Sequence, residues 1–247
     1  MCQRMNDSTG NVVGLGSISV FFPCYNEQDN LQRTYESATT ILTRMGVEYE
    51  IILVDDGSMD TTPKIADAIA AADAKVKVVH HQRNMGYGLA LRSGFKAATK
   101  SLVFFTDSDG QFSLEELPAL LPLMRQYDII SCYRLNRQES FIRRCNAWCW
   151  TNLVCVVFGL KIRDINCAFK LYKRYVFAGM ELRSTGALIN AEIFARAKKR
   201  GFKISQVGVH HFPRTIGLQT GANFLVVFRA FWELLTLHSV IKRDMAR

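Results

Sequence analysis

The sequence predicts one α/β domain built on a mostly parallel, Rossmann-like sheet with helices on both of its faces. Three observations favour this fold class. Short apolar runs alternate with amphipathic stretches from residue 17 onward, which is typical of strand–helix repeats. Each apolar run is followed by a cluster of polar residues. The chain has 247 residues, of which 49% are apolar, so it is long enough to bury a large core.

The strands are expected where the apolar runs are short and rich in Val, Ile and Phe. In chain order these runs lie at 18–22, 50–54, 75–79, 102–105 and 127–132. Nearly continuous apolar runs indicate strands that are buried on both faces, as in a parallel sheet.

The helices are expected between these runs, at 29–45, 62–72, 88–98 and 113–125. In the first helix, Leu31 and Leu42 lie on one face at helical spacing. Pro63 is typical of the first turn of a helix, where its missing N–H costs nothing. Ser113 and Glu116 have the spacing of a capping box, which predicts that the last helix begins there.

Polar clusters follow four of the predicted strands. They are PCYNE (23–27), DDGSMD (55–60), RNMGYG (83–88) and DSDGQ (107–111). Because ligands of doubly wound sheets bind at the carboxyl ends of the strands, we expect these four clusters to form one site.

The DSDGQ segment predicts a site for a divalent cation. In an extended chain, alternate residues share a side, so Asp107, Asp109 and Gln111 can direct oxygen atoms to one point. Mg²⁺ and Mn²⁺ prefer such oxygen ligands and often complete their shell with substrate phosphates. The alternatives from the residues alone are an ordinary acidic turn and the nucleophile motif of a haloacid-dehalogenase-type phosphatase. Phe112 and Pro118 exclude an EF-hand, which needs Gly and Glu there.

Composition limits the classes of partner and compartment. Lys and Arg exceed Asp and Glu by 31 to 22, a net charge of +9 that favours nucleic acid, acidic lipid or phosphorylated substrates. The seven cysteines never occur as CxxC, so we expect neither a zinc site nor a disulfide framework, and a reducing compartment fits. No cleavable signal and no spanning helix are expected from the apolar runs.

The segments VFFPCYNE, VDDGSMDTT, RNMGYGLALRSG, TDSDGQF and RDINCAFKLYKR occur in this order. With them the chain resembles the family 2 glycosyltransferases, in particular the branch of dolichyl- and polyprenyl-phosphate sugar synthases, over residues 17 to about 220. This order disfavours the phosphatase, whose DxD would lie near the start of its fold. It also disfavours a nucleotidyltransferase, which would have a Gly-rich loop where this chain has PCYNE.

The resemblance implies a GT-A fold and an inverting transfer of a hexose from a nucleoside diphosphate sugar, of the GDP-mannose or UDP-glucose type, with Mg²⁺ or Mn²⁺ on the diphosphate. It assigns roles by position. Donor binding falls to Pro23, Tyr25, Glu27, Asp55, Asp56, Asn84, Gly86 and Asp107; metal binding to Asp107, Asp109 and Gln111; catalysis to Asp109, Asp164, Arg144 and Arg214; and binding of the acceptor phosphate to Arg134 and Arg144.

The expected acceptor is a polyprenyl or dolichyl phosphate. A phosphate monoester is already largely a dianion at neutral pH, so it needs cations rather than a protein base. An acceptor hydroxyl, on a saccharide or a lipid, would need a base, for which Asp164 and Glu192 are the candidates. A third hypothesis is a non-catalytic, membrane-associated binding subunit, against which the intact DSDGQ argues.

Three regions are expected: a polar tail at 1–16, the glycosyltransferase domain at 17–220, and an amphipathic, membrane-facing helix at 221–247. The stretches at 141–160 and 224–237 have the pattern of interfacial helices, although helices that cover the sheet would have the same pattern. We therefore expect peripheral attachment to the cytoplasmic face of a membrane, with a membrane-anchoring protein as a further partner, and no nucleic-acid binding.

Overall fold

The computed structural model describes residues 16–136, 141–213, 234, 236, 237 and 239–241. Within them, one sheet has the strand order β3-β2-β1-β4-β6-β5-β7. The strands are β1 (Ile18–Cys24), β2 (Tyr49–Asp55), β3 (Val76–His80), β4 (Leu102–Thr106), β5 (Ile129–Leu135), β6 (Phe169–Lys173) and β7 (Ile204–His210). The first four strands are parallel, and β6 is antiparallel to β4 and β5. The predicted mostly parallel sheet is confirmed.

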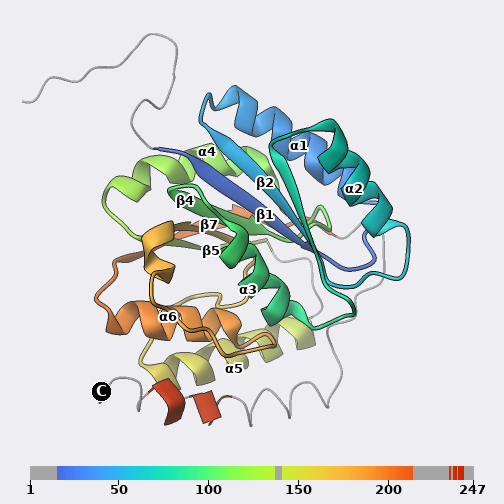
Figure 1. Ribbon diagram of the computed structural model, residues 1–247. Helices are drawn as coiled ribbons and strands as arrows, with labels where there is room; N and C mark the ends of the chain where they lie inside the picture. Colours follow the sequence, from blue (N-terminus) through green and yellow to red (C-terminus); the bar gives the residue numbers. More distant parts are fainter. Residues whose placement is uncertain (1–15, 137–140, 214–233, 235, 238, 242–247) are drawn as a thin grey trace, which may run out of the picture.

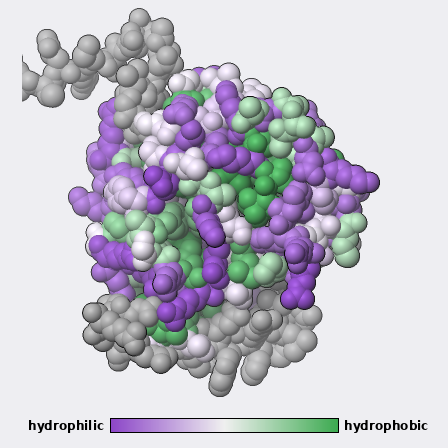
Figure 2. All heavy atoms as spheres, in the orientation of Figure 1, coloured by the Kyte–Doolittle hydropathy of each residue, from purple (hydrophilic) through white to green (hydrophobic). Residues whose placement is uncertain are grey.

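Helices cover both faces of the sheet (Figure 1). They are α1 (Leu31–Arg44), α2 (Thr62–Ala72), α3 (Tyr87–Ala97), α4 (Leu117–Leu120), α5 (Phe141–Phe158) and α6 (Ile189–Lys199). Side chains alternate along β1, so that Phe22 packs in the core beneath α1, α2 and α4, whereas Phe21 packs in the core beneath α3, α5 and α6. The surface of the molecule that Figure 2 shows is largely hydrophilic, and its apolar side chains lie in separate patches.

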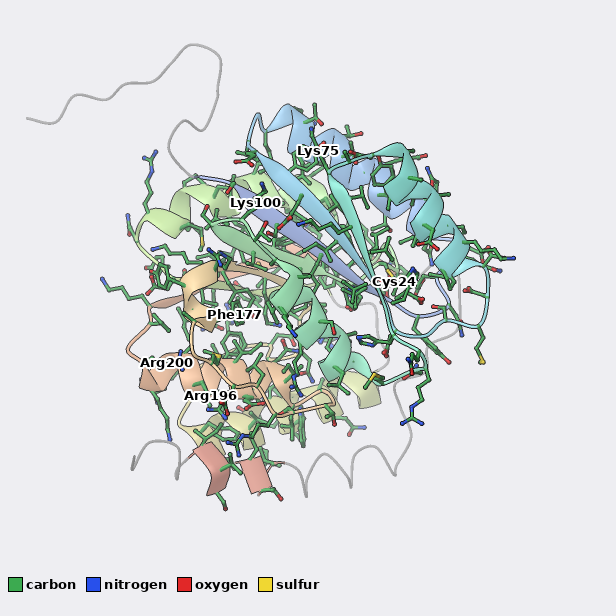
Figure 3. The ribbon with its side chains drawn as sticks, viewed as in Figure 1. Cys24, Lys75, Lys100, Phe177, Arg196 and Arg200 are labelled. Atoms are coloured by element: carbon green, nitrogen blue, oxygen red, sulfur yellow. The ribbon has the colours of Figure 1, made fainter. Side chains whose placement is uncertain are left out.

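Aromatic packing brings α3 close to the centre of the sheet. A β-carbon at Gly94 would lie 2.3 Å from the ring of Phe21, so this position needs glycine. The ring of Phe95 meets Phe21 edge-on, with 4.9 Å between centroids. The same ring stacks on that of Phe177, which is labelled in Figure 3, with 4.1 Å between centroids. This packing fixes α3 so that its first residues lie at the carboxyl edge of β1 and β4.

The helix predicted at 113–125 is broken into short turns. A 3₁₀ turn (Leu114–Glu116) precedes α4, and a second one (Leu121–Arg125) follows it. Pro118 and Pro122 lack the N–H groups that one continuous helix would use. The predicted capping box is wrong, because Ser113 makes no side-chain cap bond. Glu116 instead accepts a bond from the backbone N–H of His210, 3.0 Å away.

Of the two stretches with an interfacial pattern, the one at 141–160 lies within the described residues. On α5, Trp148 is 68% exposed and Val156 is 80% exposed. The stretch at 224–237 lies mostly outside the described residues, as does the tail at 1–15. Leu234, Leu237 and Ile241 are buried in the core beneath α5 and α6. None of the helices within the described residues has both the length and the apolar character needed to cross a bilayer.

A buried carboxylate links β1, β2 and β3 near the amino-terminal ends of these strands. Glu50 on β2 is 4% exposed and accepts a bond from the Ser19 hydroxyl of β1 at 2.6 Å. The Lys77 ammonium of β3 lies 2.6 Å away, and the backbone N–H of Thr99 is 2.7 Å away. Burial alone would raise the pKa of Glu50, but the bonds from Lys77, Ser19 and Thr99 outweigh it and lower the pKa to about 2.

We expect Glu50→Gln to lower the free energy of unfolding by about 2 kcal/mol at pH 7, since bonds to a charged group are stronger than bonds to an amide. A depressed pKa stabilises the fold above the unfolded-state value of 4.5, and this contribution is lost as the pH falls toward 2. Urea unfolding should therefore show the two proteins converging in stability between these pH values. A difference that stays constant with pH would contradict this role of the carboxylate.

Candidate active site

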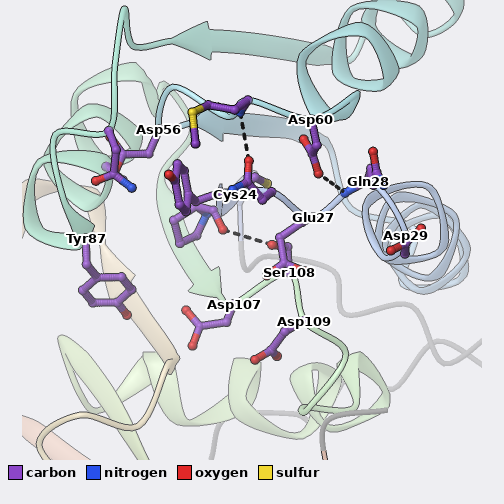
Figure 4. A pocket seen from close by; sticks show the side chains of 16 residues that line it. Cys24, Glu27, Gln28, Asp29, Asp56, Asp60, Tyr87, Asp107, Ser108 and Asp109 are labelled. Atoms are coloured by element: carbon purple, nitrogen blue, oxygen red, sulfur yellow. Dashed lines mark hydrogen bonds between the residues drawn. The ribbon is translucent and has the colours of Figure 1, made fainter. Parts of the chain in front are cut away.

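A cavity of about 950 Å³ opens at the carboxyl ends of β1, β2, β3 and β4 (Figure 4). The loops after all four strands line it, as the clustering of polar motifs predicted. Most residues assigned to the donor and metal are in its wall, namely Pro23, Tyr25, Glu27, Asp56, Asn84, Asp107 and Asp109. Asp55 lines an adjoining cavity of about 500 Å³, which shares Tyr25 and Asn84 with the first.

The segment after β4 directs two carboxylates into the cavity. Asp107 and Asp109 project to the same side (Figure 4). Ser108, between them, points back and donates to the carbonyl of Pro23 at 3.1 Å. Burial, together with the nearby charge of Asp109, raises the pKa of Asp107 to about 7. These two adjacent carboxylates form a site that fits a divalent cation, because the cation would favour the charged form of Asp107 beside Asp109.

The backbone orients one of these carboxylates, since the N–H of Gln111 donates to Asp109 Oδ1 at 3.0 Å. The described residues hold no group of three or more His, Cys, Asp or Glu side chains suited to a metal. A pair of aspartates is nevertheless enough for Mg²⁺ or Mn²⁺ when substrate phosphates and water supply the other ligands.

Gln111 has a different environment from the two aspartates. It does not line the cavity, and its side-chain N–H donates to the carbonyl of Phe212 at 3.1 Å. The backbone N–H of Phe212 donates in return to the carbonyl of Gln111 at 2.9 Å. Gln111 therefore holds the segment after β7 beside the site. Its expected role as a third metal ligand stays a prediction.

Asp56 at the end of β2 organises the loop after β3. Its carboxylate accepts bonds from the backbone N–H groups of Met85 (2.9 Å) and Gly86 (2.8 Å). The imidazole of His81 contacts it at 2.6 Å and contacts the hydroxyl of Ser93 on α3 at 2.8 Å. Asp56 thus fixes the shape of the loop that places Asn84 in the cavity wall. Gly86 takes part in this loop through its backbone N–H, which bonds to Asp56.

Asp55 makes contacts of the same kind, with a backbone N–H group and a histidine. It is 3% exposed, accepts a bond from the backbone N–H of Ser58 at 3.0 Å, and contacts His80 Nδ1 at 2.9 Å. The bond to Asp55, opposed by burial and assisted by Asp67, raises the pKa of His80. The sequence analysis missed both histidine contacts. The register of β2 with β3, which pairs Asp55 with His80, is what creates them.

The loop after β1 is bonded to the loop after β2. The Asn26 side chain accepts a bond from the N–H of Met59 at 2.9 Å, and the N–H of Glu27 donates to the hydroxyl of Thr62 at 2.9 Å. The Glu27 carboxylate accepts a bond from the Asn30 amide at 2.7 Å. These bonds give a fixed shape to the part of the cavity wall that the loops after β1 and β2 form.

Two of the residues assigned to catalysis and to the acceptor phosphate contact each other. Arg134 forms a two-point ion pair with Asp164, with its Nε 2.8 Å from Oδ2 and its Nη2 3.1 Å from Oδ1. Arg144 is exposed in the first turn of α5 and does not line the cavity. Arg214 lies outside the described residues. The roles assigned to these four residues stay predictions.

Glu192 is fully buried in the first turn of α6. Its carboxylate accepts bonds from the backbone N–H groups of Arg183 (2.9 Å) and Ser184 (2.8 Å). The Nε of Arg196, one turn along α6, lies 2.9 Å away. Glu192 therefore holds the loop before α6 and has no access to an acceptor hydroxyl.

Two residues near the site were not singled out by the sequence analysis. Lys170 on β6 is fully buried, and its ammonium donates to the carbonyl of Cys167. Burial lowers the pKa of Lys170, while its charge acts to lower the pKa of Asp107. A lysine within the apolar run FKLY was the available signal. The second missed residue is Tyr87, whose ring lines the cavity.

A parallel sheet with polar loops gathered at the carboxyl ends of its strands is typical of α/β proteins that bind a ligand at that edge, nucleotides among them. Residues 19–179 match the family model described as glycosyl transferase family 2. The chain belongs to this family, and its GT-A fold and glycosyltransferase class are confirmed. The assignment to the polyprenyl-phosphate branch stays a prediction.

Solved structures of glycosyltransferases have the same fold. Glucosyl-3-phosphoglycerate synthase from Mycobacterium tuberculosis, in complex with phosphoglyceric acid, is 20% identical with a TM-score of 0.69, over 91% of this chain and 80% of that one. The same enzyme with Mn²⁺, UDP and glucosyl-3-phosphoglycerate is 18% identical with a TM-score of 0.66, over 88% and 80%. Mannosyl-3-phosphoglycerate synthase from Rubrobacter xylanophilus is 17% identical with a TM-score of 0.68, over 94% and 75%.

We expect Asp109→Ala to lower kcat for sugar transfer by on the order of 10²-fold or more, because it removes one of the two carboxylates that would hold the cation. Circular dichroism should show an intact fold, since Asp109 lies in a rim loop. Glu115→Gln, which changes an exposed carboxylate on the neighbouring turn, is the matched control and should keep wild-type activity. Full activity in Asp109→Ala would disprove the metal assignment.

Proposed function

We propose that the protein is a metal-dependent, inverting hexosyltransferase that moves a sugar from a nucleoside diphosphate, of the GDP-mannose or UDP-glucose type, to a polyprenyl or dolichyl phosphate at a membrane surface. The observation that carries the proposal concerns the two carboxylates offered as bases. Asp164 is ion-paired with Arg134, and Glu192 is buried among backbone N–H groups. Such a site favours an acceptor that is already ionised, as a phosphate monoester is.

The residues at the end of β4 support the metal requirement. Asp107 and Asp109 would hold Mg²⁺ or Mn²⁺, and complexes of the similar M. tuberculosis enzyme contain Mn²⁺ or Mg²⁺ together with UDP. A bound cation would supply positive charge to stabilise the charge that builds on the leaving diphosphate. The protein's own part is to hold the two carboxylates side by side and to recess them from water.

The donor would lie along the wall formed by the loops after β1, β2 and β3. Tyr25 and Asn84 line both neighbouring cavities, so they are placed to contact the nucleoside. The acceptor oxygen would then attack the anomeric carbon from the side opposite the diphosphate. A bond forms to the acceptor, the bond to the diphosphate breaks, and the configuration inverts.

A second candidate acceptor is a small phosphorylated molecule. The similar solved structures are of enzymes named for 3-phosphoglycerate, and one contains phosphoglyceric acid. Both candidates carry a phosphate, and they differ in whether the acceptor lies in a membrane.

The exposed face of α5 supports a lipid acceptor. Trp148 and Val156 are strongly exposed, and Leu153 between them is 37% exposed. Apolar side chains on one face of a helix, on a protein with a net charge of +9, suit peripheral binding to an anionic membrane surface. We propose attachment to the cytoplasmic face by this helix, alone or with an anchoring partner protein.

Two successive experiments identify first the donor and then the acceptor. A thermal-shift panel of GDP and UDP sugars, with and without Mn²⁺, should show metal-dependent stabilisation by one donor, because a ligand of the folded state raises the melting temperature. That donor is then assayed with polyprenyl phosphate in vesicles, the corresponding polyprenyl alcohol, and 3-phosphoglycerate.

Product from the lipid phosphate alone supports the proposal, and product from 3-phosphoglycerate alone replaces it with the second candidate. Product from the alcohol would disprove the argument from the engaged carboxylates. The same vesicles test attachment, since Trp148→Glu should reduce cosedimentation, whereas Met59→Glu, at an exposed apolar residue in the loop after β2, should not.

A further inference from the structure

Tyr87 occupies a position in the cavity that the proposed function does not yet use. It is the first residue of α3 and projects into the cavity opposite Asp107 (Figure 4). It lies on the wall away from Gln28 and Asp60, which line the cavity beside α1 and α2. Its hydroxyl group is thus close to the aspartates and far from the outer rim.

A buried amide on another helix acts on the Tyr87 hydroxyl. Asn190 on α6 is 1% exposed, and its side chain acts to lower the pKa of Tyr87, against the larger effect of burial. An amide N–H directed at the phenol oxygen has this effect. Because a phenol has one proton, that proton remains available for another acceptor. The carbonyl oxygen of Asn190 has no hydrogen-bond partner among the described residues, so the pair forms no closed local network.

The backbone at Tyr87 is held just as firmly. The N–H of Gly88 donates to the carbonyl of Thr185 at 3.0 Å. A β-carbon at Gly88 would lie 2.5 Å from the carbonyl carbon of Thr185, so the loop before α6 packs directly on the start of α3. Glu192 holds that loop through the N–H groups of Arg183 and Ser184. The loop before α6 therefore fixes the backbone at the start of α3, next to Tyr87.

The electrostatics keep Tyr87 a neutral donor. Burial, followed by the negative charge of Asp107, raises the pKa of Tyr87 well above its usual value. The hydroxyl stays protonated at neutral pH. The charges of Lys170 and Arg134 partly oppose the rise in the pKa of Asp107, so cationic groups lie near this end of the cavity.

The transferred sugar must lie between the diphosphate that it leaves and the acceptor that it joins. Tyr87 faces Asp107, one of the two aspartates that would hold the cation on the diphosphate, at the end of the cavity near the cationic groups. We propose that the Tyr87 hydroxyl donates a hydrogen bond to an oxygen of the transferred hexose, and that Asn190 positions it. This inference rests on the proposed use of a nucleoside diphosphate sugar.

The test compares two ligands that differ only by the sugar. Isothermal titration calorimetry in Mn²⁺ would measure Kd for the preferred nucleoside diphosphate sugar and for the corresponding nucleoside diphosphate. In Tyr87→Phe, Kd for the sugar nucleotide should rise about 3- to 10-fold, the effect of losing one hydrogen bond. Kd for the nucleoside diphosphate should not change. Asn190→Ala should change the same Kd in the same direction by a smaller factor.

Tyr35→Phe is the matched control, because it removes a hydroxyl that bonds Asp73 away from the cavity and should leave both Kd values unchanged. Unfolding curves without ligand identify any variant that fails to fold. An unchanged Kd for the sugar nucleotide in folded Tyr87→Phe, or an equal rise for both ligands, would overturn the inference. If the wild-type protein binds neither ligand, the proposed function itself fails.

Discussion

The structure depends on the placement of two carboxylates side by side at the end of one central strand. β4 lies between β1 and β6, and the chain that follows it places Asp107 and Asp109 in a recess where burial and the nearby charge of Asp109 raise the pKa of Asp107. Such a pair is costly to keep ionised unless a cation joins it. The anchoring of Ser108 to Pro23 keeps both side chains pointing into the cavity, so the unfavourable arrangement is maintained by the fold.

Most other acidic side chains near the site have structural partners. Asp55 and Asp56 hold histidines and loop N–H groups, Asp164 pairs with Arg134, and Glu192 ties the loop before α6. This division separates the residues that shape the cavity from those that would act on the diphosphate. It also explains why an acceptor that needs no protein base fits the site. The α6 region supports the cavity indirectly, through the loop that packs on α3 and through Asn190.

The sheet and the gathering of four motifs could be predicted because parallel strands bring their carboxyl ends to one edge, so local patterns determine a shared location. The partners of each side chain could not be predicted in this way. Gln111 bonds to Phe212, which is 101 residues further along the chain, and Asp55 meets His80 through strand register. The break in the helix at 113–125 follows from Pro118 and Pro122, which the prediction from the capping pattern at Ser113 and Glu116 did not take into account. Lys170 was not singled out, although its place within the apolar run FKLY indicated that it is buried.

The central claim is that two protein carboxylates and a nucleoside diphosphate together form the metal site. The most direct measurement is the affinity of the wild-type protein for Mn²⁺, followed by electron paramagnetic resonance, without nucleotide and with GDP or UDP present. With only two carboxylates at the end of β4, binding to the protein alone should be weak, and the preferred diphosphate should tighten it at least about tenfold, because it supplies the remaining oxygen ligands. Equally tight Mn²⁺ binding with and without either nucleotide would contradict the account.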